Sequence, residues 1–160
     1  MSAWESFFVA EVGASAALAG LVFVGLSINL DKIIAGPGLP GRALEALVAL
    51  TVVLVVSSLL LIPGQPQALI GGELLVSGLA FWIAIVSLQV ANLRTLAPPY
   101  RGVFAVRVAL GQLASVPFVI AGVAVLVRGE GGPYWGVPGV IVSFVLALLD
   151  AWVLLVEINR

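Results

Sequence analysis

The chain has 160 residues, of which 62% are hydrophobic and only 9% are charged, and its net charge is −1. Ordinary soluble domains are about 45–50% apolar and about 25% charged, and a chain this short could not hide so much apolar surface from water. The composition therefore predicts an integral membrane protein, with a single transmembrane domain that covers residues 1–160.

The same numbers exclude several classes of function. Seven basic residues against eight acidic ones do not make the clustered positive surface that nucleic acid binding requires. The chain has no Cys and no His, so it lacks disulfides, thiolate ligands and imidazole ligands. We therefore expect no cofactor, no bound metal and no nucleic acid partner.

Five apolar runs are long enough to cross a bilayer as helices, which takes roughly 20 residues each. Clusters of Pro and Gly, which stop helices, separate the runs. The predicted fold is an all-α bundle whose spans cover residues 7–30, 43–62, 69–90, 103–127 and 137–158. An alternative with four spans would need one run to be buried or re-entrant. The first run should stay in the mature protein, because the residues before it include Glu5 and no basic residue, unlike a signal peptide.

Basic residues are concentrated on one side of the predicted membrane. Only Arg128 falls on the other side. Because cytoplasmic loops are rich in Lys and Arg, this asymmetry predicts an external N-terminus and a cytoplasmic C-terminus. The residues on the basic side are Lys32, Arg42, Arg94, Arg101 and Arg160.

The first and third predicted helices share a polar pattern. Glu11 and Ser15 in the first correspond to Glu73 and Ser77 in the third, about sixty residues further along the chain. The correspondence favours an internal duplication of a two-helix unit followed by a fifth helix, since parallel repeats are common in transporter folds. The other interpretation is a chance likeness between two apolar helices with Pro-rich loops.

These two helices also carry polar residues along one face each. An ionisable residue near the bilayer centre costs about 2.5–3.5 kcal/mol on insertion scales, so each is a candidate functional residue. If the two stripes face each other, or face copies in an oligomer, they form a carboxylate-lined vestibule that attracts cations. Alternatively, both glutamates reach the headgroups or are protonated. The candidate pathway residues are Glu11, Ser15, Asn29, Glu73, Ser77 and Ser87.

The first helix has a second face made of small residues. Gly13, Ala17 and Gly20 lie opposite the polar face and allow the close backbone approach by which membrane helices associate. This face is the predicted helix packing surface.

Two further charges fall inside apolar runs and need partners. Asp150 lies within the fifth predicted helix, and Arg107 is the basic residue whose long side chain can reach it or Glu45. A structural ion pair is the simpler interpretation of Arg107, Asp150 and Glu45, and a moving gate or proton relay is the other.

The segment GASAALAGLVFVGLSINL, residues 13–30, follows Trp4 and the pair Phe7-Phe8. It resembles the opening helix of a family of small bacterial inner-membrane proteins to which no activity is assigned. The resemblance covers the first helix well and the remainder in outline. It implies a multi-pass protein of the bacterial plasma membrane and implies no particular activity.

Two functional hypotheses follow. The leading one is a small oligomeric channel or carrier for cations, since five thin helices enclose little volume without symmetry mates. The competing one is a non-conducting accessory protein that binds a larger membrane complex through its small-residue face. An enzyme is not expected, because Ser–His and zinc hydrolases need residues that this chain lacks, and Asp150 is the one Asp inside a span. The expected partners are lipids, copies of the chain and another membrane protein.

Overall fold

The computed structural model describes residues 4–93, 101–129 and 131–156, and in these ranges every regular element is helical. The predicted all-α class is confirmed. Each of the five long helices is long and apolar enough to cross a bilayer, which indicates a multi-pass membrane protein. These are α1 (Glu5–Ile28), α3 (Leu39–Leu60), α4 (Gln67–Leu93), α5 (Arg101–Arg128) and α6 (Val137–Leu155), and the short elements are α2 (Leu30–Ala35) and the 3₁₀ helix η3 (Gly132–Gly136).

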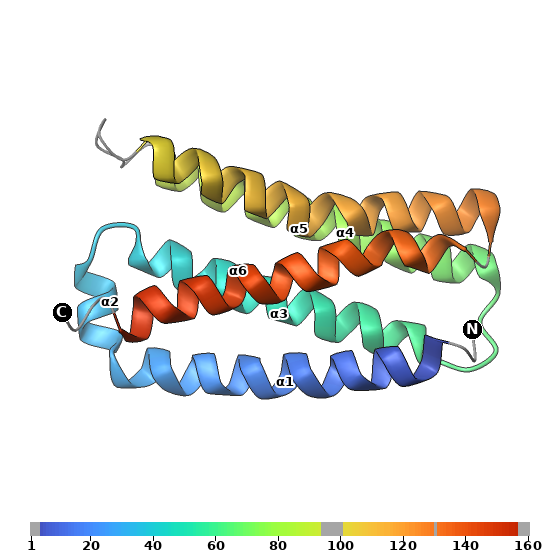
Figure 1. Cartoon of the computed structure of the whole chain (residues 1–160), viewed down its shortest axis with the longest axis horizontal. Helices are drawn as coiled ribbons and strands as arrows, with labels where there is room; N and C mark the ends of the chain where they lie inside the picture. The colour runs from blue at the N-terminus through green and yellow to red at the C-terminus, as the bar shows by residue number, and fades with distance from the viewer. Residues whose placement is uncertain (1–3, 94–100, 130, 157–160) are drawn as a thin grey trace.

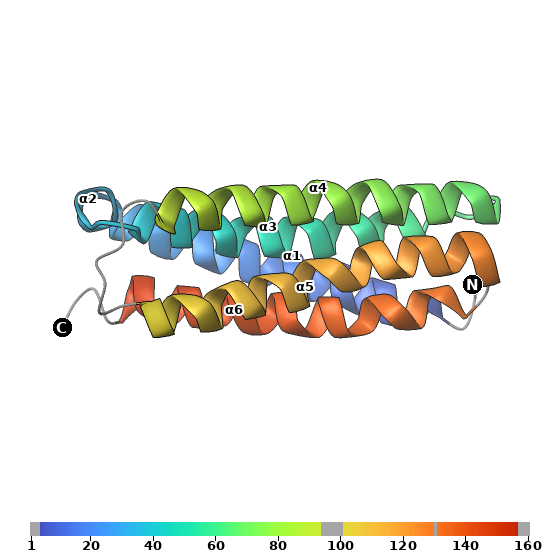
Figure 2. The same ribbon diagram turned by 90° about the horizontal axis from the view of Figure 1, so that it is seen from above.

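The long helices lie nearly parallel to one axis in three layers (Figures 1 and 2). Helices α4 and α5 form one layer, α3 and α6 the middle layer, and α1 the third (Figure 1). We call the end where α1 begins the amino end and the end where α6 finishes the carboxyl end; they are opposite ends of the bundle (Figure 1). Helix α3 packs on α1, α4 and α6, so it is the centre of the fold.

Turn residues stop the helices close to where the Pro and Gly clusters predict. Gly38, Gly64 and Gly129 have positive φ angles of 78°, 73° and 79°, a conformation that residues with a Cβ rarely adopt. Pro40 lies in the first turn of α3, where its missing N–H costs no hydrogen bond, so α3 begins inside the predicted break. The cluster Ala97-Pro98-Pro99, which separates the third and fourth predicted spans, lies outside the described residues.

The first predicted span is wrong at its end. Residues 7–30 were expected to form one helix, but α1 ends at Ile28 and a short helix, α2, follows Asn29. The Asn29 side chain donates a hydrogen bond to the backbone oxygen of Gly25 at 3.3 Å, and the Asn29 backbone N–H donates to the same oxygen. Asn favours such local bonds over a regular helix interior, so Asn29 marks the break.

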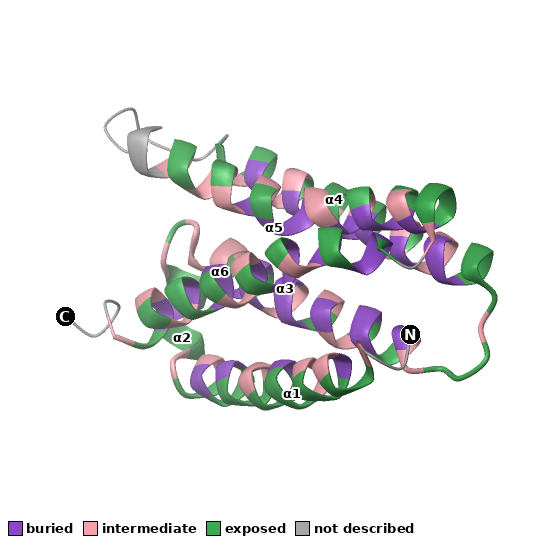
Figure 3. Cartoon of the chain, turned by 45° about the vertical axis from the view of Figure 1, so that its right-hand side comes forward, coloured by how far each residue is buried: buried purple, intermediate pink, exposed green. Residues whose placement is uncertain are grey.

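The two faces of α1 have the reverse of their predicted roles. Gly13, Ala17 and Gly20 are exposed, and a Cβ added at either glycine would meet nothing within 4 Å. Helix α1 packs instead through residues that include Ser15, which belonged to the predicted polar face. Figure 3 shows the long exposed face that results. The buried residues of α1 are Phe8, Ser15, Val22 and Gly25.

The small-residue packing expected of α1 occurs between α4 and α5. A Cβ added at Gly78 would lie 2.7 Å from the backbone nitrogen of Val119, and one at Gly122 would lie 2.5 Å from that of Leu75. Real Cβ atoms do not approach backbone so closely, so these glycines allow the two helices to touch. Phe81 and Phe118 complete the contact edge to face, with ring centroids 6.0 Å apart.

Candidate functional site

Arg107 of α5 reaches across the core to two acidic side chains. Its Nη1 donates to Asp150 Oδ1 of α6 at 2.8 Å, and its Nη2 lies 3.4 Å from Asp150 Oδ2. The same Nη2 donates to Glu45 Oε2 of α3. The structure thus brings together the three residues that the sequence suggested as an ion pair, and one guanidinium joins three helices.

This cluster is buried well inside the helix ends. The side chains of Glu45 and Asp150 are 1% and 3% exposed, and that of Arg107 is 13% exposed. Glu45 and Arg107 each come six residues after the first residue of their helix, which places them roughly 9 Å inside the carboxyl end. Charges at such a depth are costly in lipid unless they are paired, and these are paired.

One carboxylate oxygen of the cluster has no hydrogen-bond partner. Glu45 Oε1 is buried and has no hydrogen-bond partner, although Oε2 of the same carboxylate is bonded to Arg107. Arg42, three residues earlier on α3, is close enough for its charge to interact with Arg107, Asp150 and Glu45. With Arg42 included, two positive and two negative charges balance, yet one carboxylate oxygen is unsatisfied.

A chain of amide groups connects the cluster to the middle of α4. Trp82 Nε1 donates to Gln112 Oε1 at 2.7 Å, and Gln112 Nε2 lies 3.5 Å from Gln89 Oε1. Gln89 Nε2 then donates to the backbone oxygen of Arg107 at 3.4 Å. These contacts satisfy polar groups that would otherwise face apolar surroundings, and they tie the α4–α5 interface to the residue that holds the ion cluster.

Buried hydroxyl groups continue along the same helices towards the amino end. Ser57 of α3, Ser115 of α5 and Ser143 of α6 are each 1% exposed or less. Ser115 donates to the backbone oxygen of Gly111 at 2.8 Å, whereas Ser143 Oγ has no partner. Ser143 precedes Asp150 by one heptad, so the two share one face of α6.

Within one chain, the two predicted acidic stripes do not face each other. Helix α1 packs on α3 and α6, whereas α4 packs on α5 and α3, so α3 lies between the two stripes (Figure 1). Glu73 accepts hydrogen bonds at 3.1 Å from Gln65 Nε2 through both oxygens, while Glu11 Oε2 is buried without a partner. A vestibule made by facing copies stays a prediction.

The serines of these stripes bond to their own helices. Ser15 donates to the backbone oxygen of Glu11 at 2.6 Å, and Ser87, which is exposed, donates to that of Ile83 at 2.7 Å. Ser77 is half-buried. Since these hydroxyls bond to their own backbone, they do not link α1 to α4.

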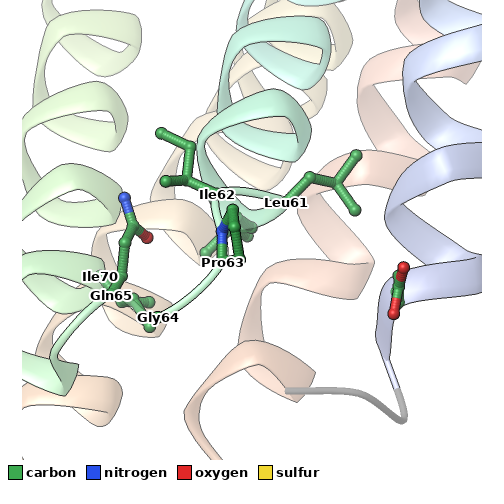
Figure 4. Close-up of a pocket in the computed structure, with 8 residues that line it drawn as sticks. Leu61, Ile62, Pro63, Gly64, Gln65 and Ile70 are labelled. Carbon is green, nitrogen blue, oxygen red and sulfur yellow. The ribbon is translucent and has the colours of Figure 1, made fainter.

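A depression of about 400 Å³ opens at the amino end beside the turn between α3 and α4 (Figure 4). Its walls are mostly apolar, and its polar side chains are Glu5 and Gln65. Because Gln65 also bonds to Glu73, this end of the bundle gathers carboxylates from α1 and α4. The lining residues are Glu5, Leu60, Leu61, Ile62, Pro63, Gly64, Gln65 and Ile70.

Sequence reasoning missed the amide chain and the role of Arg42. Gln89 and Gln112 are the amide side chains inside the apolar runs that form α4 and α5. Their position among apolar residues could have indicated that they need hydrogen-bond partners within the bundle. Arg42 was assigned to a loop because Gly41 and Pro40 precede it, but α3 begins before them, at Leu39. Glu157 follows Asp150 by seven residues in the sequence, as Asp150 follows Ser143, but Glu157 lies outside the described residues.

Comparison with known proteins found no matching family model, no similar curated protein and no similar solved structure. The resemblance of residues 13–30 to a family of small bacterial inner-membrane proteins therefore stays a prediction.

Proposed function

We propose that the chain is a small membrane channel or carrier for cations, in which the cluster of Glu45, Arg107 and Asp150 forms the gate at the carboxyl end. The observation that carries the proposal is the unsatisfied, buried oxygen of Glu45 beside a guanidinium that two carboxylates share. For stability alone, apolar side chains of similar volume serve as well as or better than a buried ion cluster. Ionisable groups retained inside a membrane usually border an ion pathway or a switch.

The amino end supplies the other part of the proposal. Helices α1 and α4 carry Glu5, Glu11 and Glu73 in their amino-end parts. Glu5 lines the depression of about 400 Å³, and Gln65, which also lines it, bonds to Glu73. Carboxylates at a mouth raise the local concentration of cations. The chain acts without enzymatic chemistry in this proposal, and copies of it assemble so that the acidic stripes of different chains line the entrance.

The proposed site of action is the bacterial inner membrane, with the carboxyl end of the bundle in the cytoplasm. The basic residues at that end, among them Lys32 and Arg42, favour this orientation. The internal duplication belongs to the same proposal, because parallel repeats place equivalent acidic residues at the same depth.

The orientation predicts a clear labelling pattern. The chain has no Cys, so a single thiol can be placed at either of two exposed prolines in turns, Pro63 at the amino end and Pro37 at the carboxyl end. In intact cells, a membrane-impermeant maleimide should label the Pro63→Cys variant. It should label Pro37→Cys only after the inner membrane is permeabilised. The reverse pattern would invert the proposed orientation.

Cation flux into liposomes that contain the purified chain tests the function itself. We expect the Glu11→Gln and Glu73→Gln double variant to lose flux by about tenfold, because two attracting charges leave the entrance. Ser58→Ala is the matched control, since this exposed hydroxyl donates to the backbone of its own helix, α3, and lies outside the candidate pathway. Wild-type flux no greater than that of empty liposomes, across pH and voltage, would remove the channel and carrier hypothesis.

The second candidate function is a non-conducting accessory protein, and the exposed face of α1 favours it. Gly13, Ala17 and Gly20 present a smooth surface that no described part of the chain covers. Small residues on a lipid-facing helix suit close packing against another membrane helix. The flux measurement separates the two candidates, because an accessory protein would not conduct alone.

A further inference from the structure

We propose that Glu45 Oε1 binds a proton that enters from the carboxyl end, and that the proton is the cation this protein translocates. The inference rests on the proposed function for translocation, although proton binding can be tested without any transport. Its starting point is geometric: Glu45 is 1% exposed, and its Oε1 atom has no partner while Oε2 is held by Arg107. A buried carboxylate oxygen without a donor has an open position for one hydrogen atom.

The groups around Glu45 make a proton a better occupant than a larger cation. Arg107 and Arg42 place positive charge beside the carboxylate and oppose any added cation, and a metal ion would in addition need several oxygen ligands. In the described part of the chain, no three acidic side chains gather in a way that could hold a metal ion. A proton needs one oxygen and no coordination shell.

The elements packed near Glu45 differ in the charge that they bring to it. Helix α4 faces this region with neutral amides, and the two acidic residues of α1 lie at the amino end. On α2, Asp31 and Lys32 are both exposed. Among the described residues, the charged groups that face Glu45 are Arg42 from α3, Arg107 from α5 and Asp150 from α6.

The proton transfer conserves atoms and charge. A hydronium ion at the carboxyl end gives its proton to the Glu45 carboxylate, an O–H bond forms at Oε1, and water leaves. The cluster of Arg42, Glu45, Arg107 and Asp150 then changes from neutral to a net charge of +1. Of the three side chains joined by ion pairs, Arg107 is the most exposed, at 13%.

Protonation also changes which helices the cluster joins. Arg107 Nη2 is shared between Glu45 and Asp150 Oδ2, and the latter contact is 3.4 Å long. When Glu45 is neutral, the charge that draws Nη2 to it is lost, so Nη2 turns to Asp150 and completes a two-bond pair with that carboxylate. The link between α3 and α5 weakens while the link between α5 and α6 strengthens. A proton can therefore loosen α3 at the carboxyl end.

Infrared difference spectroscopy tests the binding step directly. As the pH is lowered, the wild-type protein in lipid should show the C=O band of a protonated carboxyl group shielded from water. The band should shift when the protein is labelled with [¹³C]glutamate and not when it is labelled with [¹³C]aspartate. It should be absent in Glu45→Gln and present in Asp150→Asn and in the control Glu73→Gln.

Several outcomes would overturn the assignment to Glu45. They are a band that survives in folded Glu45→Gln, a band that shifts with labelled aspartate, and no band at any pH. If Glu45→Gln does not fold, the isotope labels in the wild-type protein still decide whether the proton sits on a glutamate or on Asp150.

Proton flux, followed with a pH-sensitive dye inside liposomes, separates this inference from the proposed function. We expect Glu45→Gln to lower proton flux at least tenfold, while Ser58→Ala leaves it unchanged. A glutamate band without any proton or other cation flux would support the binding site and overturn translocation. Flux of Na⁺ or K⁺ without a glutamate band would support the channel and overturn the proton site.

Discussion

Replacing Arg107 by Met is expected to lower the free energy of unfolding by about 3–5 kcal/mol, the range seen when one partner of a buried ion pair is removed. The reason is that Glu45 and Asp150 would remain as carboxylates that are 1% and 3% exposed, without the guanidinium that they share. Met occupies similar space along the same path. The decrease in the free energy of unfolding therefore reflects the loss of charge and hydrogen bonding more than the formation of a cavity.

The measurement is denaturant unfolding of the purified protein in detergent micelles, followed by circular dichroism. Arg128→Met is the matched control, because Arg128 is exposed and is the last residue of α5, at the amino end of the bundle. The triple variant with Glu45→Gln and Asp150→Asn should recover most of the loss, since no charge then lies unpaired in the core. Equal stability of Arg107→Met and Arg128→Met would show that the cluster contributes little to folding.

The second large effect is expected at the contact between α4 and α5. Gly78→Ala should cost about 1–3 kcal/mol, the usual range for overpacking, because the new Cβ would meet backbone atoms of Phe118 and Val119 at 2.9 and 2.7 Å. Backbone cannot rotate away as a flexible side chain can, so the two helices would have to separate. Unfolding in micelles measures the change.

Gly72→Ala is a close control for this experiment. Gly72 lies on the same helix, and a Cβ added there would meet nothing within 4 Å. Both substitutions gain the same helix propensity, up to about 1 kcal/mol, so the difference between the variants isolates the packing contact. If Gly78→Ala is as stable as Gly72→Ala, the helices are less tightly packed than the structure shows.

The bundle as a whole was predictable because its causes are local. Apolar runs of sufficient length must form helices in lipid, since no other structure satisfies the backbone hydrogen bonds of a single segment. Residues such as Gly64, with its φ of 73°, then set the turns. The prediction that Arg107 and Asp150 would meet also had a local cause, because each was a rare charge within an apolar run.

The faces of the helices were harder to predict, and α1 shows why. Gly13, Ala17 and Gly20 make a good packing face, but whether such a face is used depends on what the neighbouring helices present. Here α1 packs on α3 and α6 through Phe8, Ser15 and Val22, which are spaced seven residues apart. The periodicity of the residues shows which faces of a helix could pack, but it does not determine which face does. This holds particularly for a helix that is apolar on every side.

Composition and hydropathy were enough to predict a helical protein with five segments able to span a membrane and with few charges inside them, which must be paired. They could not predict that α3 separates the acidic stripes of α1 and α4, that Arg107 holds Glu45 as well as Asp150, or that Glu45 Oε1 has no partner. Helix formation follows from each segment and its solvent, whereas the position of one side chain relative to another depends on the packing of all the helices at once.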